Sequence, residues 1–170
     1  ATQHIIGIPV NKSRFNGYNG TQVTNAQLKA ARPDPEAVRI IPIGGLGEFG
    51  IGKNMTAIEY KNEIILIDMG VLFAGEDYPG LNYMVPDIKY LEDNIDKIKA
   101  ILFTHAHLDH IGACRHLLPK FSPLTPIYAT DFTIGMIKKQ MSELDELPEM
   151  NYQVVDPFKH EKLQVSEHLS

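Results

Sequence analysis

The segment 103–110, Phe-Thr-His-Ala-His-Leu-Asp-His, places three histidines and one aspartate within six positions. Imidazole nitrogens and carboxylate oxygens are common ligands of divalent metals, and four such groups this close repel or compete unless a cation binds them. The pattern therefore predicts a metal site with four ligands, which are His105, His107, Asp109 and His110. Any fold of this chain has to bring these side chains together.

The residues that flank this cluster predict where it lies in the fold. Residues 100–103 form a short apolar run typical of a buried strand. Residues 109–118 have apolar side chains at helical spacing, and Pro119 ends that pattern. The cluster is therefore expected to lie between the end of a strand and the start of a helix.

The spacing within the cluster indicates two metal ions. His105 and His107 are two residues apart, so on extended backbone their side chains point to the same side and can share one ion. Asp109 and His110 would bind a second ion. Two ions about 3.5 to 4 Å apart can lower the pKa of a bridging water toward about 7 and neutralise charge on an attacked phosphoryl or carbonyl group. These ligands therefore indicate a hydrolase.

The rest of the chain predicts a mixed α+β domain. Residues 1–37 are rich in Asn, Gly, Thr and Gln, and we interpret them as an N-terminal extension or linker before a domain that covers residues 38–170. β-rich runs predict strands at residues 38–43, 54–60, 63–67 and 127–129, and a late β pair at 152–155 and 163–165. Helices are predicted at residues 86–94 and 131–144, and residues 68–85 are predicted to be a loop. Strands come first, and helix and strand then alternate, which favours a layered α+β fold.

The glycine-rich segment 45–54 matches two nucleotide-binding motifs in part. Residues 45–50 fit Gly-x-Gly-x-x-Gly, and residues 47–54 fit a phosphate-binding loop that has Asn54 where Ser or Thr is needed. Both motifs need a helix next, but residues 54–60 are β-rich. The 15 positions from Lys53 to Asp68 are also too few for a helix and a returning strand. We therefore do not expect a nucleotide site here.

Asp68 ends the apolar run 64–67, and two interpretations of it stay open. It could face the metal cluster and orient a ligand histidine, or it could be an ordinary aspartate in the turn after a strand. Other candidates are predicted to lie outside the metal site. Cys114 is expected to be a small buried helix residue, and His116 and His168 are expected not to be ligands.

Composition excludes some classes of function. The formal net charge is −5, so the chain has no overall basic field of the kind that attracts nucleic acid, and RNA binding must rest on local groups. One cysteine excludes an internal disulfide, and no apolar run approaches the roughly 20 residues of a membrane span. Residues 1–10 do not resemble a signal peptide. We therefore expect a cytoplasmic protein with no membrane partner.

Taken together, these motifs resemble a known family. His105-x-His107-x-Asp109-His110, with Asp68 at the end of an upstream strand, is similar to the signature of the metallo-β-lactamase superfamily. Within that superfamily, ribonuclease J is the group that the chain resembles at residues 41–48, 53–56, 85–88 and 110–113. The resemblance runs from about residue 38 to residue 170. Residues 51–52 depart from the family pattern and look like an insertion.

The resemblance implies an α+β metallo-β-lactamase fold, an αββα sandwich of which this chain holds the first half. It implies two zinc ions per complete domain, with manganese as an alternative, and hydrolysis of RNA phosphodiesters by endonuclease and 5′-to-3′ exonuclease action. His105 and His107 would hold one ion, and Asp109 and His110 the other. Asp109 would also position the water, and Asp68 would support the site. RNA would be the substrate, and the full-length protein is expected to be a homo-oligomer.

The resemblance also implies parts that would follow Ser170: a His-Ser-Ile-Pro-Asp motif, a bridging aspartate, a beta-CASP domain and a later histidine. Two ions need about six or more ligands, so we expect residues 1–170 alone to bind zinc weakly and to show no nuclease turnover. Two other functions stay open. One is a different hydrolase of the same fold, such as a tRNA 3′-processing nuclease, a lactonase or a thioesterase. The other is a non-catalytic RNA-binding or scaffold subunit with a vestigial site.

Overall fold

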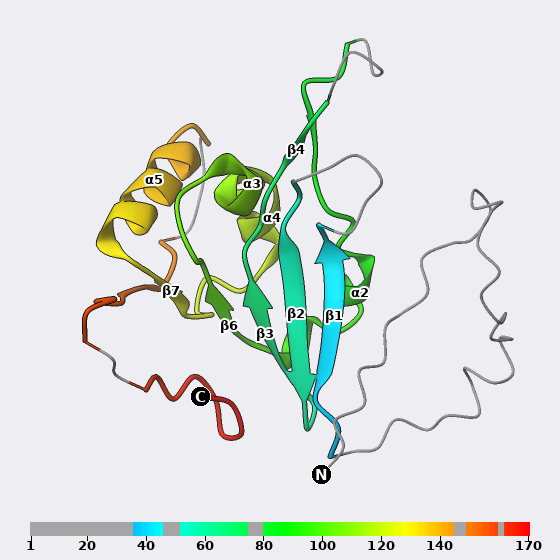
Figure 1. Cartoon of the computed structure of the whole chain (residues 1–170), viewed down its shortest axis with the longest axis vertical. Coiled ribbons are helices and arrows are strands. Elements are labelled where there is room, and N and C mark those ends of the chain that lie inside the picture. The colour runs from blue at the N-terminus through cyan, green and yellow to red at the C-terminus, as the bar shows by residue number, and fades with distance from the viewer. Residues whose placement is uncertain (1–35, 46–51, 75–79, 145–148, 160–161) are drawn as a thin grey trace, which may run out of the picture.

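A six-stranded mixed sheet is at the centre of the computed structural model, which describes residues 36–45, 52–74, 80–144, 149–159 and 162–170 (Figure 1). The strands follow one another across the sheet as β1 (Arg39–Gly44), β2 (Met55–Tyr60), β3 (Glu63–Ile67), β6 (Ile98–Leu102), β7 (Ile127–Ala129) and β8 (Tyr152–Val154). The pairs β1–β2 and β2–β3 are antiparallel. From β3 to β8 each pair is parallel, so the carboxyl ends of β3 and β6 meet at the same edge.

A two-residue turn joins β2 to β3, as the sequence predicts. Lys61 and Asn62 have φ angles of 45° and 67°, in the left-handed region. Two successive positive φ values are typical of the type I′ turn, whose twist matches the twist of paired strands. This turn fixes the register of the hairpin, in which Tyr60 pairs with Glu63.

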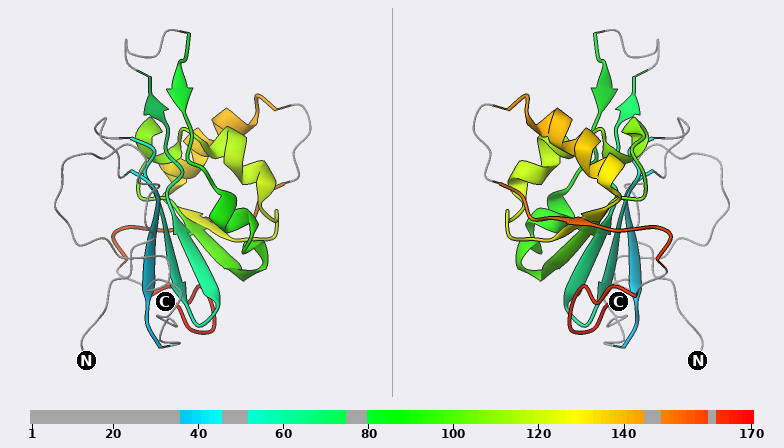
Figure 2. Two further views of the ribbon diagram at one scale, coloured as in Figure 1. Left: turned by 90° about the vertical axis from the view of Figure 1, so that its right-hand side faces the viewer. Right: turned by 90° about the vertical axis from the view of Figure 1, so that its left-hand side faces the viewer.

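The helices lie together on one side of the sheet (Figure 2). They are α2 (Lys89–Glu92), α3 (Leu108–Ile111), α4 (Cys114–Leu117) and α5 (Asp131–Met141), with 3-10 turns η1 (Ile95–Lys97) and η2 (Leu118–Lys120). Thr130 caps α5, because its side chain accepts a hydrogen bond from the Thr133 amide. A separate ribbon of two short strands, β4 (Leu72–Phe73) and β5 (Tyr83–Met84), projects from the domain (Figure 1). Within the described ranges, no helix is long and apolar enough to cross a lipid bilayer.

The sheet face beneath these helices forms the hydrophobic core. One row of side chains crosses five strands in register and is almost completely buried: Ile41, Ala57, Leu66, Ile101 and Ile127, each with at most 1% of its surface exposed. Side chains from every α-helix join the same cluster, among them Leu91, Ile111, Leu117 and Ile137. Burial of this apolar surface is the main force that holds the helices on the sheet.

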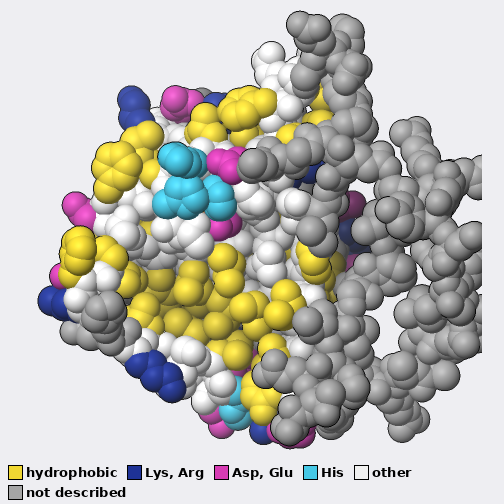
Figure 3. Space-filling model, in the orientation of Figure 1, with side chains coloured by type: hydrophobic (Ala, Val, Ile, Leu, Met, Phe, Trp, Pro, Cys, Tyr) yellow, Lys and Arg dark blue, Asp and Glu magenta, His cyan; other side chains and the backbone are white. Residues whose placement is uncertain are grey.

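The opposite face of the sheet is also apolar, and none of the helices in the described ranges covers it (Figure 2). Ile40, Ile58, Ile65 and Ala100 are aligned in one row across four strands, and Ile40 is 42% exposed. Figure 3 shows a broad hydrophobic area on this face, directly below the histidine side chains. The arrangement is one helix layer on one sheet with a second apolar face, which is the first half of the predicted αββα sandwich.

The strands predicted at residues 38–43, 54–60, 63–67 and 127–129 are confirmed, with ends that differ by at most one residue. The helices predicted at residues 86–94 and 131–144 are shorter than expected, since α2 has four residues and α5 ends at Met141. The predicted extension at residues 1–37 falls outside the described ranges except for its last two residues.

Three predictions of secondary structure were wrong. Residues 163–165 do not pair with 152–155, because β8 pairs in parallel with β7 and Val165 instead donates to Leu169 O at 3.1 Å in a turn. The loop predicted at residues 68–85 contains β4 and β5. The helix predicted at residues 109–118 is divided into α3 and α4, because backbone groups of Asn54 and Met69 make hydrogen bonds with this segment.

Candidate metal centre

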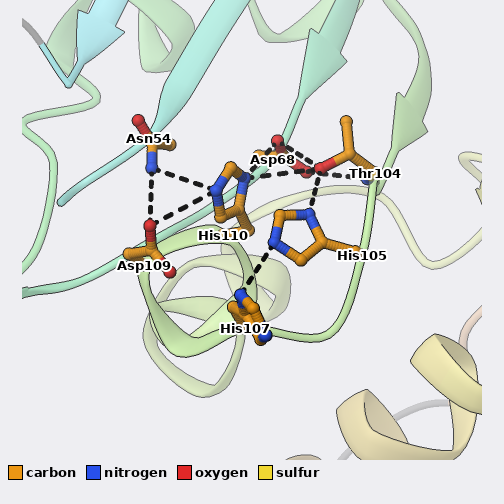
Figure 4. A network of polar contacts seen from close by, with 7 residues as sticks. All are labelled: Asn54, Asp68, Thr104, His105, His107, Asp109 and His110. Carbon is orange, nitrogen blue, oxygen red and sulfur yellow. Dashed lines mark hydrogen bonds and ion pairs between the residues drawn. The ribbon is translucent and has the colours of Figure 1, made fainter. Parts of the chain in front are cut away.

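The candidate centre lies where the parallel strands β3 and β6 end side by side. Ile67 at the end of β3 pairs with Leu102 at the end of β6. The chain leaves β3 at Asp68, whose backbone N–H donates to Leu102 O at 2.9 Å, and it passes from β6 through Thr104 into His105. Two neighbouring strand ends therefore bring an acid and the histidine cluster to one place (Figure 4).

Asp68 is buried, with 5% of its surface exposed, and its φ of 63° lies in the left-handed region. Its carboxylate accepts hydrogen bonds from Thr104 N at 2.9 Å, Thr104 Oγ1 at 2.9 Å and His110 Nδ1 at 2.8 Å. Because an ionised carboxylate can only accept, the network assigns the hydrogen of His110 to Nδ1 and leaves a lone pair on Nε2. Of the two interpretations of Asp68, these contacts support the one in which it orients a ligand histidine.

His105 and His107 face each other on the segment between β6 and α3. His105 Nε2 lies 3.1 Å from His107 Nδ1, and the ring centroids are 4.5 Å apart. Two nitrogen ligands of a tetrahedral zinc ion, each at about 2.0 to 2.1 Å from it, stand about 3.3 Å apart. The separation of these two nitrogens is therefore close to that of a pair that shares one ion.

Asp109 and His110 form a second pair on α3. Asp109 Oδ2 lies 3.3 Å from His110 Nε2, the nitrogen that keeps its lone pair. The His110 ring is also close to the first pair, since its centroid is 4.0 Å from that of His105. The structure therefore gathers all four predicted ligands, and Asp68, at one edge of the sheet.

The nitrogen and oxygen atoms that could bind a metal lie close together in two pairs, His105 with His107 and Asp109 with His110. Within the part of the chain that the structure describes, no three His, Cys, Asp or Glu side chains converge to hold a metal ion by themselves. The nitrogen and oxygen donors nevertheless suit zinc or manganese, and the lone pair on His110 Nε2 fits a ligand. The residues present therefore fit an incomplete ligand set, to which further ligands would have to be added.

The break between α3 and α4 fixes the second pair. In a continuous helix, Ala113 N would donate to Asp109 O, four residues earlier. Here Ala113 N donates to Met69 O at 2.9 Å, and Asp109 O accepts from Asn54 N at 3.0 Å. His110 O likewise accepts from Met69 N at 2.7 Å. The segment after β3 thus replaces helical hydrogen bonds with its own and ties the backbone of both ligands to the sheet.

Gly70 makes this approach possible. A Cβ atom at this position would lie 1.5 Å from Asp109 O and 2.8 Å from Asn54 N. Both are backbone atoms, which cannot turn aside as a flexible side chain can. Gly70 N also donates to Asn54 O at 2.9 Å, so the residue links three segments of the site.

Two residues that touch the ligands were not predicted as parts of the site. Asn54 Nδ2 lies 3.1 Å from Asp109 Oδ2 and 3.3 Å from His110 Nε2, and the Thr104 hydroxyl contacts Asp68 and His105 (Figure 4). In the sequence, Asn54 stands out only because it occupies the Ser or Thr position of a phosphate-binding loop. The signal available for Thr104 was its position directly before the cluster, at the end of a buried strand.

A pocket of about 280 Å³ adjoins the centre on the side of β1 and β2. Its lining includes Pro42, Gly45, Asn54, Thr56, Asp68 and His110. Asp68 and His110 therefore face both the ligand cluster and a space that a small part of a substrate could enter.

The other candidates lie outside the cluster, as predicted. Cys114 is completely buried, and burial raises the pKa of its thiol, so it stays a neutral packing residue. His116 Nε2 lies 2.7 Å from the Tyr83 hydroxyl beside a different pocket. Partial burial, followed by the charge of Arg115, lowers the pKa of His116. His168 packs edge-on against the Tyr60 ring.

Comparison with known proteins agrees with this geometry. The Metallo-beta-lactamase superfamily matches residues 50–164. The chain is 41% identical over 109 residues to ribonuclease J of Mycolicibacterium smegmatis, which covers 64% of this chain and 19% of the relative. It is 42% identical over 121 residues to ribonuclease J 1 of Streptococcus pyogenes, which covers 71% of this chain and 20% of the relative. The chain thus spans about a fifth of the length of these curated relatives.

Solved structures also show similarity. The metallo-beta-lactamase fold protein YhfI from Bacillus subtilis has a TM-score of 0.45 and 18% sequence identity, over 74% of this chain and 48% of that chain. The family match covers the strands from β2 to β8, the helices and all four predicted ligands of the site. This chain therefore belongs to the metallo-beta-lactamase superfamily, and within it the chain is similar to ribonuclease J.

Proposed function

We propose that residues 38–170 are the N-terminal part of the catalytic domain of a metal-dependent ribonuclease that hydrolyses RNA phosphodiesters, as an endonuclease and a 5′-to-3′ exonuclease. The observation that carries the proposal is the gathering of the His105/His107 and Asp109/His110 pairs at the ends of β3 and β6. The similarity to ribonuclease J at about 40% identity supports RNA as the substrate.

Each site residue has a role in this proposal. His105 and His107 hold one divalent ion, and Asp109 and His110 hold a second, with zinc as the expected metal and manganese as the alternative. When bound, such ions supply an activated water and neutralise charge on the phosphoryl group. The Asp109 carboxylate orients that water, and Asp68 keeps the Nδ1 hydrogen of His110 in place from behind.

The uncovered sheet face supports the proposal that this chain is half of a sandwich. Monomeric soluble proteins rarely leave a broad apolar area open to water. The exposed part of this face, which includes Ile40, therefore needs a second layer, which we assign to the part of the protein that also supplies the remaining metal ligands. We expect the complete protein to act in the cytoplasm as a homo-oligomer.

The test uses the full-length protein that contains this sequence, purified with its metal. We expect about two zinc ions per chain and cleavage of 5′-monophosphorylated RNA. The His107→Ala variant should lose at least about 100-fold in cleavage rate, because an exposed ligand is removed with little change to the core. His168→Ala, which removes a histidine outside the cluster, is the matched control and should cleave normally.

Two results would contradict this function. An active protein that hydrolyses a lactone, a thioester or the 3′ extension of tRNA, but not 5′-monophosphorylated RNA, would favour another hydrolase of the same fold. A protein that holds no metal and still binds RNA would favour a scaffold subunit.

A further inference from the structure

The hydroxyl of Thr104 lies between the buried acid and the first pair of histidines. Thr104 Oγ1 is 2.9 Å from Asp68 Oδ2 and 3.1 Å from Asp68 Oδ1. On its other side it is 3.0 Å from His105 Nδ1. Thr104 therefore bridges Asp68 to a histidine that Asp68 itself is not seen to contact (Figure 4).

Counting donors and acceptors gives this bridge a direction. A threonine hydroxyl has one hydrogen to donate and two lone pairs that can accept. Since the Asp68 carboxylate can only accept, the Thr104 hydrogen goes to Asp68 and a Thr104 lone pair faces His105. The hydrogen of the His105 ring is then on Nδ1, and its Nε2 keeps a lone pair.

The free nitrogen of His105 is the one that faces the other ligand. His105 Nε2 lies 3.1 Å from His107 Nδ1, the separation that suits a shared ion. His110 needs no such bridge, because its Nδ1 is 2.8 Å from Asp68 and 3.4 Å from Thr104 Oγ1. The Asp68 carboxylate thus contacts His110 of the second pair directly, and it is linked to His105 of the first pair through the Thr104 hydroxyl.

We propose that Thr104 is a positioning residue. Its hydroxyl donates to Asp68 and accepts from His105 Nδ1, and so sets the tautomer and ring orientation of His105 in the first metal pair. The inference rests on the proposed role of His105 and His107 as ligands of one ion. It differs from a purely structural role, in which the Thr104 side chain would only join the ends of β3 and β6. A structural anchor would support both pairs equally, whereas the bridge acts mainly on the first pair, because Thr104 Oγ1 lies 3.0 Å from His105 Nδ1 and 3.4 Å from His110 Nδ1, which has its own contact with Asp68.

The test compares Thr104→Val and Thr104→Ser in the full-length protein. Valine keeps the shape and removes the hydroxyl, and the hydrogen bond from Thr104 N to Asp68 does not depend on the side chain. Zinc competition and the visible spectrum of the cobalt-loaded protein report the two ions separately. For Thr104→Val we expect about tenfold weaker binding of the His105/His107 ion and less than about twofold change for the other ion. Thr104→Ser should restore the affinity.

Thr125→Val is the matched control, because it makes the same change just before β7, at a residue outside the candidate centre and outside the pocket that adjoins it. A measurement on the unsubstituted protein makes the test independent of whether a variant folds. The imidazole ¹⁵N shifts of the metal-free protein should show His105 protonated on Nδ1 and free on Nε2. The opposite tautomer would overturn the proposal, as would equal weakening of both ions in Thr104→Val.

The outcomes separate this inference from the proposed function. A protein that binds two ions and shows the expected Thr104 effects, but does not cleave RNA, refutes the ribonuclease and supports the bridge. A protein that cleaves RNA and binds its first ion equally well with valine at this position refutes the bridge and supports the ribonuclease. A protein that binds no ion refutes both.

Discussion

The two halves of the metal cluster are built in different ways. Asp109 and His110 belong to a short helix whose backbone is bonded to the segment after β3 and to the start of β2. His105 and His107 lie on the connection between β6 and α3, and the Thr104 hydroxyl and their contact with each other hold their rings. His107 is exposed, whereas His105, Asp109 and His110 are half-buried.

One motif in the sequence is thus supported by two kinds of structure. The second pair depends on main-chain geometry, so changes of shape near it should damage the fold as well as the site. In the first pair the His105 ring is held by the Thr104 hydroxyl, so changes of chemistry there should weaken metal binding and leave the fold intact. Substitutions that change shape at one pair and chemistry at the other should therefore have different effects on stability and on metal binding.

Gly70→Ala should have the largest effect. The new Cβ would lie 1.5 Å from Asp109 O, so the segment after β3 would have to move away from α3. We expect the free energy of unfolding to fall by about 3 kcal/mol or more, and the second ion to be lost. Chemical denaturation measures the first effect, and zinc stoichiometry the second.

Gly135→Ala is the control for this substitution. Gly135 lies in α5 with open space around its missing Cβ, so alanine there should stabilise the protein by about 0.5 to 1 kcal/mol. A Gly70→Ala protein with unchanged stability and both ions in place would refute the view that main-chain contact fixes the second pair.

Asp68→Asn should weaken both pairs, because this carboxylate orients His110 directly and His105 through Thr104. Asparagine has one acceptor oxygen in place of two, and its amide nitrogen would face donors. We expect zinc affinity to fall by about 10- to 100-fold at each ion. A loss confined to one ion, measured by competition with a zinc chelator, would show that Asp68 does not serve both pairs.

Asn54→Ala should affect the second pair alone. Its side-chain amide lies 3.1 Å from Asp109 Oδ2, and its backbone contacts to Asp109 and Gly70 would remain. We expect about tenfold weaker binding of the second ion and little change at the first, read from the cobalt spectrum during titration. Thr104→Val is expected to do the opposite, and to weaken binding of the first ion while leaving the second almost unchanged. Equal weakening at both ions would argue that the two halves are not independent.

His116→Gln should have the smallest effect and no effect on either ion. The pKa of His116 is lowered by partial burial and then by Arg115, so the folded protein disfavours the protonated ring. Its contribution to stability is therefore complete above the ordinary pKa of about 6.5 and is lost as the pH falls through that value. Glutamine should reduce the loss of stability between pH 7.5 and 5.5 by less than about 0.5 kcal/mol, measured by urea unfolding at each pH. A change in zinc stoichiometry would show that this histidine takes part in the centre.

The central strands and the grouping of the candidate ligands could be predicted from the sequence because their signals are local. Apolar runs such as residues 63–67 are typical of buried strands, and the spacing of His105 and His107 follows directly from strand geometry. Their position at a strand end was also predictable, since a polar cluster cannot extend a buried strand.

The rest depends on contacts between segments that are distant in the sequence. Nothing near residues 109–118 reveals that Met69 and Asn54 will take the hydrogen bonds of that helix and divide it. The role of Asn54 was hidden for the same reason, because its partner Asp109 is 55 positions away. The pair predicted at residues 152–155 and 163–165 failed because β8 found its partner in β7, an earlier strand, rather than in the next β-rich run.

The divided helix also has a consequence for motion. A short helix on a protein surface usually opens and closes on its own, with little cost to the rest of the molecule. Here the Met69 amide donates to His110 O in α3, and the Ala113 amide after α3 donates to Met69 O beside the end of β3. The helix and the strand end therefore cannot open independently of each other. The residues that would bind the second ion therefore belong to the same cooperative unfolding unit as the middle of the sheet, and the amides of Met69 and Ala113 should exchange with solvent as slowly as those of the core.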